Sequence, residues 1–540
     1  MSTTTRAAQK PDRSFRRLMV ASVIAGVVFL AVTIPALAVR SPLGHDESVY
    51  ALRSRDLLDG WTFLSGDYWR DYRAPGLPLM LSGIGRVIGV HVTTARAFAM
   101  LLGLLIVVAT ALLGRRLAHW SVGAMAAALL VLSFGFVFTS TTLLADTPGA
   151  AFAMIAVVFY LRDVDAGRLR WSYLVVPLAT FASTLSRFGA PFMIAAGLVG
   201  MAVVAAPNVV SARNWRLVAE SAVLAVGTAL VVALIVLTDT FSLNGASPSS
   251  ANRVLVGRNE FTFSTGLSDL IHVINPWSGH SAQMWSKAVG VLFLVGVVLA
   301  AVSVVVQRSG WRVVIFGFVA GTISVLSIVA TVGLVVPNYL SLTVPFWAIL
   351  AASGWDWLFR LAIAWGRDRG LPAARIAFAG AALVFVVLAV DVGRDVRAEH
   401  HKYEVAYSNL RSASLLTRQQ LGDECVLISR FTPQAGYYSQ CRISPFLDWD
   451  LPQAHDSLAV TIDAVVDRWD LGIPPDSPIA VMLVEQAIRQ PDLSELTDQD
   501  DLFGERLDEA GEPGQRGRYM ILDVVEPCVA DRSCPSFSAE

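Results

Sequence analysis

"LMVASVIAGVVFLAVTIPALA", residues 18–38, carries no charged side chain, and it is followed by a strongly charged stretch, "SPLGHDESVYALRSRD", residues 41–56. A helix needs about twenty apolar residues to cross the hydrocarbon core of a bilayer, so the first stretch predicts a membrane span. Charged side chains beside hydrocarbon are costly, and their presence there indicates a function. The two stretches together predict a membrane protein with a functional first loop.

The composition of the whole chain agrees with this prediction. Of its 540 residues 54% are hydrophobic and 16% are charged, whereas about a quarter of a soluble globular chain is charged. Apolar stretches of spanning length recur as far as residue 391 and then stop, which predicts a polytopic all-α membrane domain over 18–391. The expected eleven spans are 18–38, 93–114, 119–141, 148–161, 171–186, 189–206, 217–237, 288–307, 312–335, 339–357 and 374–391.

The positions of Lys and Arg predict the orientation, because cytoplasmic loops hold the excess of these residues. With eleven spans, the basic tail 1–17 and the later basic loops all fall on one side. We therefore expect an integral plasma-membrane protein with a cytoplasmic N-terminus and an extracytoplasmic C-terminus. Residues 74–90 are not counted as a span, because a crossing there would place the later basic loops outside. Their prolines and glycines also suit an interfacial helix within an external loop over 41–92.

The tail 392–540 has the pattern of a small extracytoplasmic α/β domain. "CVLISR", "IAVMLV" and "YMILDVV" predict buried strands, and Thr432 before a proline predicts the start of a short helix. All four cysteines lie in this tail, on the side where disulfides persist. Three pairings are possible, and four free thiols in a reducing compartment are the alternative. The simplest pairing is Cys425–Cys441 with Cys528–Cys534.

Several ionisable residues lie on the predicted outer side of the membrane domain. They are His45, Asp46 and Glu47 after the first span, Asp146 between the third and fourth spans, and the arginines Arg73 and Arg187. A carboxylate can take the proton of an acceptor hydroxyl, and an arginine can hold phosphate oxygens with two N–H groups. This combination favours group transfer from a lipid phosphate to a hydroxyl. The sequence has no P-loop, dinucleotide-binding turn, zinc-ligand spacing or nucleophile elbow.

Structural interpretations of the same residues are open at this stage. Asp46 or Glu47 can cap a helix formed by "SVYALRSRDLLDG". Asp146 can cap a helix that has Pro148 in its first turn, and Arg187 can extend to the membrane interface. A transporter or flippase of lipid-linked sugars is an alternative function, as is a non-catalytic assembly or receptor protein. The scarcity of charge in the centres of the spans is evidence against transport.

The charged first loop resembles a known family. "GHDESVYALRSRDLLDG" is similar to the first-loop signature of protein O-mannosyltransferases and lipid A aminoarabinose transferases, which are polyprenyl-phosphate-sugar-dependent glycosyltransferases of the GT-C class. The matching residues are Asp46, Glu47, Tyr50, Ala51, Arg55, Asp56 and Leu57. "DYRAPGLPLML", "LLADTPGAAFAM" and "STLSRFGAPFM" resemble later family motifs, with Arg73 where Lys is usual. The chain departs from the family at Asn338 and Tyr339, where relatives often have Arg-Tyr.

The resemblance implies a GT-C-like fold and a role for each candidate residue. Asp46 would be the general base, with Glu47 in support, and Asp146 would orient the acceptor or the sugar. Arg73 and Arg187 would bind the donor phosphate. Supporting roles would fall to Tyr50, Arg55 and Tyr339. Transfer would invert the anomeric carbon and would need no cofactor and no metal, because a carboxylate base can activate a hydroxyl unaided.

The expected partners are a polyprenyl-phosphate-linked sugar donor, a hydroxyl-bearing glycan, lipid or protein acceptor, and the lipid bilayer. The basic residues sit singly at helix ends, so no nucleic-acid partner is expected. We expect Asp46 and Asp146 to open onto one extracytoplasmic pocket with Arg73 or Arg187 on its wall. The long outer loop 238–287 is interpreted either as an acceptor-gating loop or as an ordinary surface loop.

Overall fold

A computed structural model of the chain describes most of the helical part and the strands of the tail. The described residues are 13–39, 41–58, 75–187, 190–211, 214–237, 263–275, 284–307, 310–332, 337–341, 343–369, 372–422, 425–429, 432–443, 479–485 and 519–525. The chain divides into two compact units. The helical unit consists of Met1–Ala38, Asp71–Met80 and Thr93–Val396, and the mixed unit consists of Val39–Arg70, Leu81–Val92 and Arg397–Glu540.

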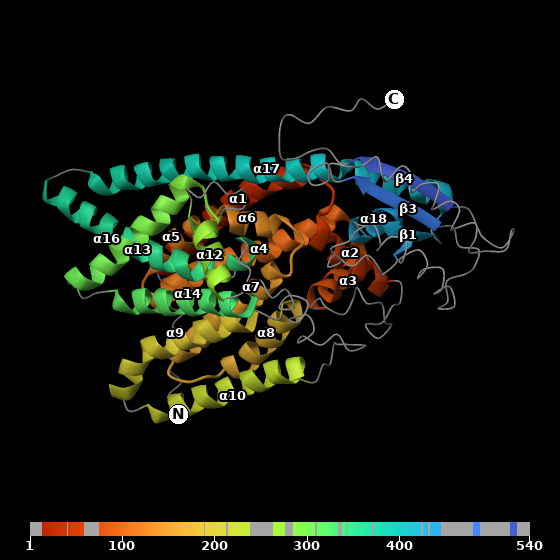
Figure 1. Cartoon of the computed structure of the whole chain (residues 1–540). Coiled ribbons are helices and arrows are strands. Elements are labelled where there is room, and N and C mark those ends of the chain that lie inside the picture. The colour runs from red at the N-terminus through yellow and green to blue at the C-terminus, as the bar shows by residue number, and fades with distance from the viewer. Residues whose placement is uncertain are drawn as a thin grey trace, which may run out of the picture. The chain divides into compact units, whose positions relative to one another are not determined.

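Apolar helices of different lengths make up the helical unit (Figure 1). They are α1 (Arg13–Ala38), α4 (Val92–Leu117), α5 (Trp120–Val131), α6 (Phe134–Thr141), α7 (Asp146–Asp165), α8 (Ser172–Ser186), α9 (Ala190–Ser211), α10 (Trp215–Leu237), α12 (Phe263–Ile274), α13 (Lys287–Gln307), α14 (Trp311–Val332), α15 (Pro337–Leu340) and α16 (Val344–Asp368). Helix α3 (Gly76–Ile88) and helix α17 (Ala373–Leu421) each run from this unit into the mixed unit.

The helical unit is that of a multi-pass membrane protein. Within the described residues, eight helices are long and apolar enough to cross a membrane, and nine if the α5–α6 pair, which is bent by 68°, forms one broken span. A helix occupies each of the eleven predicted spans, but α8 has only fifteen residues and α16 is not among the candidate spans. The number eleven and the orientation therefore stay predictions. Helix α3 has thirteen residues, too few to cross the hydrocarbon core.

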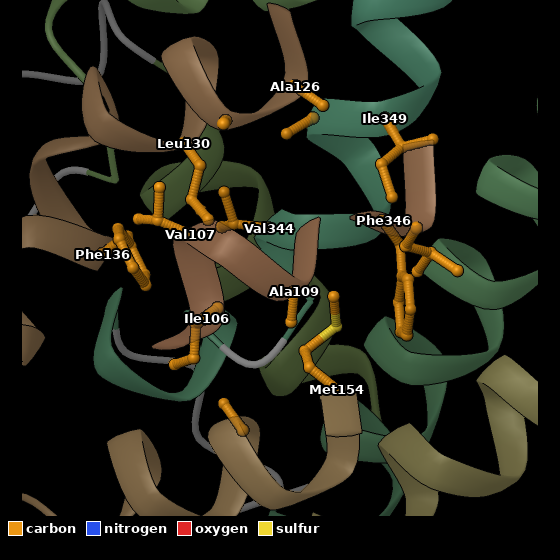
Figure 2. Close-up of a cluster of buried hydrophobic side chains, with 14 of the residues drawn as sticks. Ile106, Val107, Ala109, Ala126, Leu130, Phe136, Met154, Val344, Phe346 and Ile349 are labelled. Atoms are coloured by element: carbon orange, nitrogen blue, oxygen red, sulfur yellow. The ribbon is translucent and has the colours of Figure 1, made fainter. Parts of the chain in front are cut away.

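The core of the helical unit is built from small and branched apolar side chains. In Figure 2, Ile106 and Val107 of α4 lie near Leu130 of α5, and Phe136 of α6 lies beside them. Small residues let neighbouring helices approach closely, as membrane helices require. A Cβ atom on Gly296 of α13 would lie 2.7 Å from the backbone oxygen of Ala351 in α16. Helices α13 and α16 are therefore closely packed.

The mixed unit contains a four-stranded parallel sheet in the order β2-β1-β3-β4. The strands are β1 (Val426–Ser429), β2 (Arg442–Ile443), β3 (Ile479–Glu485) and β4 (Tyr519–Val525). The predicted strands are confirmed, and near-continuous apolar runs are typical of buried parallel strands. The crossover from β1 to β2 is α18 (Thr432–Ser439), which begins at the predicted threonine. Helix α2 (His45–Leu58) of the charged first loop also belongs to this unit.

One predicted disulfide is present in the mixed unit. Cys425 and Cys441 are bonded across a sequence separation of 16 residues, which encloses β1 and α18. Among the alternatives that the sequence left open, this pairing is therefore correct for the described cysteines. Cys528 and Cys534 lie outside the described residues.

Candidate functional site

Asp146 lies at the start of α7 and is almost fully buried. It is the first residue of the helix, the N-cap is Ala145, and the helix has no side-chain cap hydrogen bond. The carboxylate is instead paired with Arg187, whose Nη1 lies 2.8 Å from each carboxylate oxygen. The side chain of Asp146 is 1% exposed, so the guanidinium offsets a charge that water does not solvate. Asp146 is therefore not the N-cap of α7, and its carboxylate is paired with Arg187.

Arg187 terminates α8 and turns its side chain towards Asp146. It is the C-cap of the helix with an extended backbone, and its N–H still donates to the carbonyl of Ser183 at 2.9 Å. The hydroxyl of Ser183 donates to the carbonyl of Gly149 at 2.8 Å, which binds α8 to the first turn of α7. The Arg187 side chain is 20% exposed. It is therefore held in an ion pair and does not extend alone to the membrane interface.

Asn338 and Tyr339 bring a third helix, α15, to the same place. The Asn338 amide donates to Oδ2 of Asp146 at 3.4 Å. The guanidinium carbon of Arg187 lies 4.1 Å from the centroid of the Tyr339 ring, within the range of a cation–π contact. We call Asp146, Arg187, Asn338 and Tyr339 the Asp146 cluster. Three members were predicted as site residues from the sequence, whereas Asn338 stood out there only as a departure from the Arg-Tyr of the family and had no predicted role.

Buried hydroxyl groups hold the turn between α6 and α7 that carries Asp146. Thr139, Ser140 and Thr141 of α6 each donate to a backbone carbonyl three or four residues earlier. Thr147 donates to the carbonyl of Thr139 at 3.1 Å and so binds the first turn of α7 to α6. Satisfied buried hydrogen bonds make a polar segment rigid. The carboxylate of Asp146 is therefore presented from a fixed backbone.

The first-loop carboxylates lie at the start of α2 and differ in surroundings. Glu47 is 2% exposed, and its Oε2 accepts the N–H of Gly44 at 2.9 Å. This is the return bond of a capping box, so the capping interpretation is correct for Glu47. The packing favours glycine at position 44, since a Cβ there would lie 2.9 Å from the Tyr403 ring. Asp46 is half-buried, more exposed than its neighbour.

Four other predicted residues have separate outcomes. Tyr50 of α2 is buried, with 4% of its surface exposed. Arg55 donates from Nη1 to the carbonyl of Tyr437 at 2.9 Å, so it supports the fold of the mixed unit. Arg73 lies outside the described residues, and His45 begins α2.

Two further expectations stay predictions. Asp46 belongs to the mixed unit and Asp146 to the helical unit, so the expected common pocket stays a prediction. Among the described residues, no group of three His, Cys, Asp or Glu side chains is arranged to hold a metal ion. The expectation that the reaction needs no metal also stays a prediction. Of the outer loop 238–287, the structure describes α12 and the residues from 284 onward, which does not distinguish a gate from a surface loop.

Comparison with known proteins supports the family resemblance over part of the chain. Residues 72–238 match the family described as dolichyl-phosphate-mannose-protein mannosyltransferase. This segment includes Asp146 and Arg187 of the cluster, and it excludes the first-loop carboxylates and α15. The resemblance to this glycosyltransferase family is therefore confirmed for that segment. No curated protein matches the chain.

Two solved proteins share the fold at low sequence identity. ArnT from Cupriavidus metallidurans in the apo state has a TM-score of 0.53 and 16% identity, covering 85% of this chain and 92% of that one. The Archaeoglobus fulgidus oligosaccharyltransferase in the apo form has a TM-score of 0.53 and 13% identity, covering 79% of this chain. This chain spans 64% of the length of that oligosaccharyltransferase. The same archaeal enzyme in complex with an inhibitory peptide and a dolichol-phosphate has a TM-score of 0.52.

Proposed function

We propose that this chain is a membrane glycosyltransferase that moves a sugar from a polyprenyl-phosphate-linked donor to an acceptor hydroxyl. The observation that carries the proposal is the Asp146 cluster, a buried carboxylate and guanidinium joined at 2.8 Å at the ends of two apolar helices. Such a pair is costly beside hydrocarbon, which favours a functional role over a purely structural one. The match of this segment to a mannosyltransferase family supports the same reaction class.

Arg187 is suited to bind the donor phosphate. Its Nη1 contacts Asp146, and a guanidinium presents five N–H donors in a fixed fork that fits phosphate oxygens. Asp146 and the ring of Tyr339 fix the direction of the fork. We propose that Asp146 in this way orients the phosphate-binding arginine as well as the sugar.

Arg73 is the second proposed phosphate ligand, and it lies outside the described residues. Gly76 begins α3, and a Cβ there would lie 2.6 Å from the backbone carbon of Leu185 in the last turn of α8. This contact places the start of α3 beside the turn that ends in Arg187. The role of Arg73 rests on the family resemblance, in which a basic residue stands at this position.

Asp46 is the proposed general base. Glu47 is buried and accepts the N–H of Gly44, which leaves it a supporting role at the start of α2. The half-buried Asp46 is the more accessible carboxylate of the pair. A base must be accessible to its substrate, since it has to reach the proton within hydrogen-bond distance.

In the proposed reaction the acceptor hydroxyl gives its proton to the Asp46 carboxylate while its oxygen forms a bond to the anomeric carbon. The bond between that carbon and the phosphate oxygen breaks, and the polyprenyl phosphate leaves with the electron pair. Arg187 and Arg73 stabilise the charge that develops on the phosphate. Direct displacement inverts the anomeric carbon. We place this reaction on the outer face of a membrane domain with eleven spans and a cytoplasmic N-terminus.

The test is transfer of radiolabel from synthetic polyprenyl-phosphate sugars, mannose and aminoarabinose among them, to membrane acceptors by the purified protein. We expect transfer by the natural protein and at least a hundredfold slower transfer by Asp46→Asn, the typical contribution of a general base. Glu404→Gln, which neutralises a half-exposed carboxylate on α17, is the control and should transfer normally. Equal rates for Asp46→Asn and the natural protein would exclude this base. A flippase would carry the labelled lipid across vesicles without releasing polyprenyl phosphate.

A further inference from the structure

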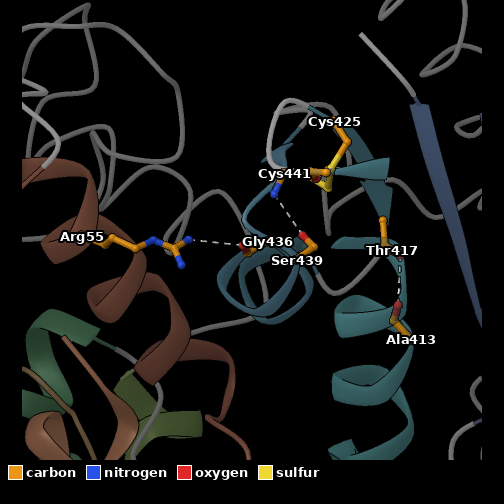
Figure 3. Close-up of a disulfide and its surroundings, with 8 residues drawn as sticks. Arg55, Ala413, Thr417, Cys425, Gly436, Ser439 and Cys441 are labelled. Atoms are coloured by element: carbon orange, nitrogen blue, oxygen red, sulfur yellow. Dashed lines mark hydrogen bonds between the residues drawn. A yellow bond between two sulfur atoms is a disulfide. The ribbon is translucent and has the colours of Figure 1, made fainter. Parts of the chain in front are cut away.

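Helix α18 of the tail contacts the first-loop helix α2 at its last turn. Arg55 donates from Nη1 to the carbonyl of Tyr437 at 2.9 Å. It also donates from Nη2 to the carbonyl of Gly436 at 3.4 Å (Figure 3). Its guanidinium carbon also lies 5.3 Å from the centroid of the Tyr437 ring. Hydrogen bonds from a charged donor are among the stronger ones in proteins. The C-terminal end of α2 is therefore attached to the backbone of α18.

The same helix holds the chain just before α2 begins. The N–H of Leu43 donates to the phenolic oxygen of Tyr438 at 2.8 Å. Leu43 immediately precedes Gly44, whose N–H is bound by Glu47 and whose carbonyl accepts the N–H of Ser48. Burial raises the pKa of Tyr438 to about 12, so the phenol stays neutral at physiological pH. The entry into α2 is thus fixed one residue before the turn that carries Asp46 and Glu47.

Helix α18 is itself connected to β1 by a disulfide and packs against α17. The Cys425–Cys441 disulfide joins the residue before β1 to the residue two positions after α18, and the Cys441 N–H donates to Ser439 at 3.2 Å (Figure 3). Both cysteines are buried with Ala435 of α18 and Leu410 of α17. The disulfide and the shared burial therefore join α18 to the start of β1 and to α17.

We propose that α18 is a positioning element for the first-loop carboxylates, that Tyr438 and Arg55 are its positioning residues, and that the Cys425–Cys441 disulfide is required to keep it in place. A displacement of about 1 Å in a reacting group can cost a hundredfold in rate. Helix α18 binds α2 at both ends, so a shift of α18 moves Asp46 with it. This inference rests on the proposed function, in which Asp46 is the base.

The first experiment removes the phenolic oxygen of Tyr438. Tyr438→Phe deprives the Leu43 N–H of its acceptor and leaves the ring in place. We expect kcat for sugar transfer to fall about tenfold with the KM for the polyprenyl donor unchanged, because a misplaced base slows chemistry more than donor binding. Tyr173→Phe is the matched control, since it removes a hydroxyl that donates to the carbonyl of Glu220 in the helical unit. Its kcat should equal that of the natural protein.

A second experiment does not depend on sugar transfer. Hydrogen exchange of the α2 amides, measured by mass spectrometry on the full chain, should accelerate in Tyr438→Phe and in the double variant Cys425→Ser with Cys441→Ser. Exchange in α13 should stay the same in both, which shows that the helical unit is intact. Unchanged α2 exchange together with unchanged kcat in both variants would overturn the proposal. If the natural protein transfers no sugar, the proposed function fails, while α2 exchange still decides whether α18 positions the helix.

Discussion

Replacing Arg187 by methionine distinguishes a functional ion pair from a purely structural one. Asp146 is 1% exposed, so the variant leaves a buried carboxylate without its cation. Removing one partner of a buried pair costs about 3–5 kcal/mol of unfolding free energy. Because Arg187 is 20% exposed, water can reach part of the vacated space, and we expect a value at the lower end, about 3 kcal/mol. The rate of sugar transfer should fall at least about a hundredfold, since the arginine proposed to bind the donor phosphate is lost.

The double variant Arg187→Met with Asp146→Asn separates the effect of the ion pair on stability from the effect of Arg187 on sugar transfer. Without either charge, the unfolding free energy should return to within about 1 kcal/mol of the natural value, while transfer should stay low. Stability is measured by denaturant unfolding in detergent, and activity by the radiolabel assay. Arg216→Met is the control, because Arg216 is 79% exposed in its pair with Glu220 and should cost less than about 1 kcal/mol. Recovered transfer in the double variant, or equal costs at Arg187 and Arg216, would refute the reasoning.

Three further predictions concern the scaffold. Gly76→Ala forces a Cβ to within 2.6 Å of the α8 backbone and should lower the unfolding free energy by about 1–3 kcal/mol in denaturant unfolding. A Cβ on Gly83 meets nothing within 4 Å, so the control Gly83→Ala should raise the unfolding free energy by up to about 1 kcal/mol. Asp163→Ala removes a buried carboxylate that accepts three hydrogen bonds, two of them from Ser172, and should lower the thermal midpoint; an unchanged midpoint would contradict this. The pKa of Tyr438 is raised to about 12 from the usual value of about 10, so its contribution to stability is complete below pH 10 and is lost as the pH rises towards 12. Tyr438→Phe should make the alkaline loss of unfolding free energy smaller than in the natural protein, and an equal loss would contradict this.

The elements of this protein were predictable because their signals are local. Apolar length predicts a helix at each of the eleven expected spans, and near-continuous apolar runs predict the strands of the tail. The start of α18 follows from Thr432 and the proline after it, and the local spacing of Cys425 and Cys441 made their pairing the simplest one. None of these inferences requires knowing which helix lies beside which.

The capping interpretation has a different outcome at each acidic residue. Glu47 has the sequence pattern of a capping residue, and the structure gives it that role. Asp146 has a similar pattern before Pro148, yet its carboxylate is bound to Arg187 and Asn338, which follow it by 41 and 192 residues. Sequence spacing carries no information on such distant partners, because packing of α7, α8 and α15 brings them together.

The sequence by itself determined that the chain is a multi-pass helical membrane protein with an α/β tail, since hydrocarbon thickness and strand periodicity act on short stretches of residues. Only the tertiary structure decided which charges are neutralised by which partners, that Asn338 belongs to the Asp146 cluster, and that α18 holds both ends of α2. The physical reason is that burial of a charge or of a hydrogen-bonding group is set by all the helices packed around it, and that packing depends on the whole chain.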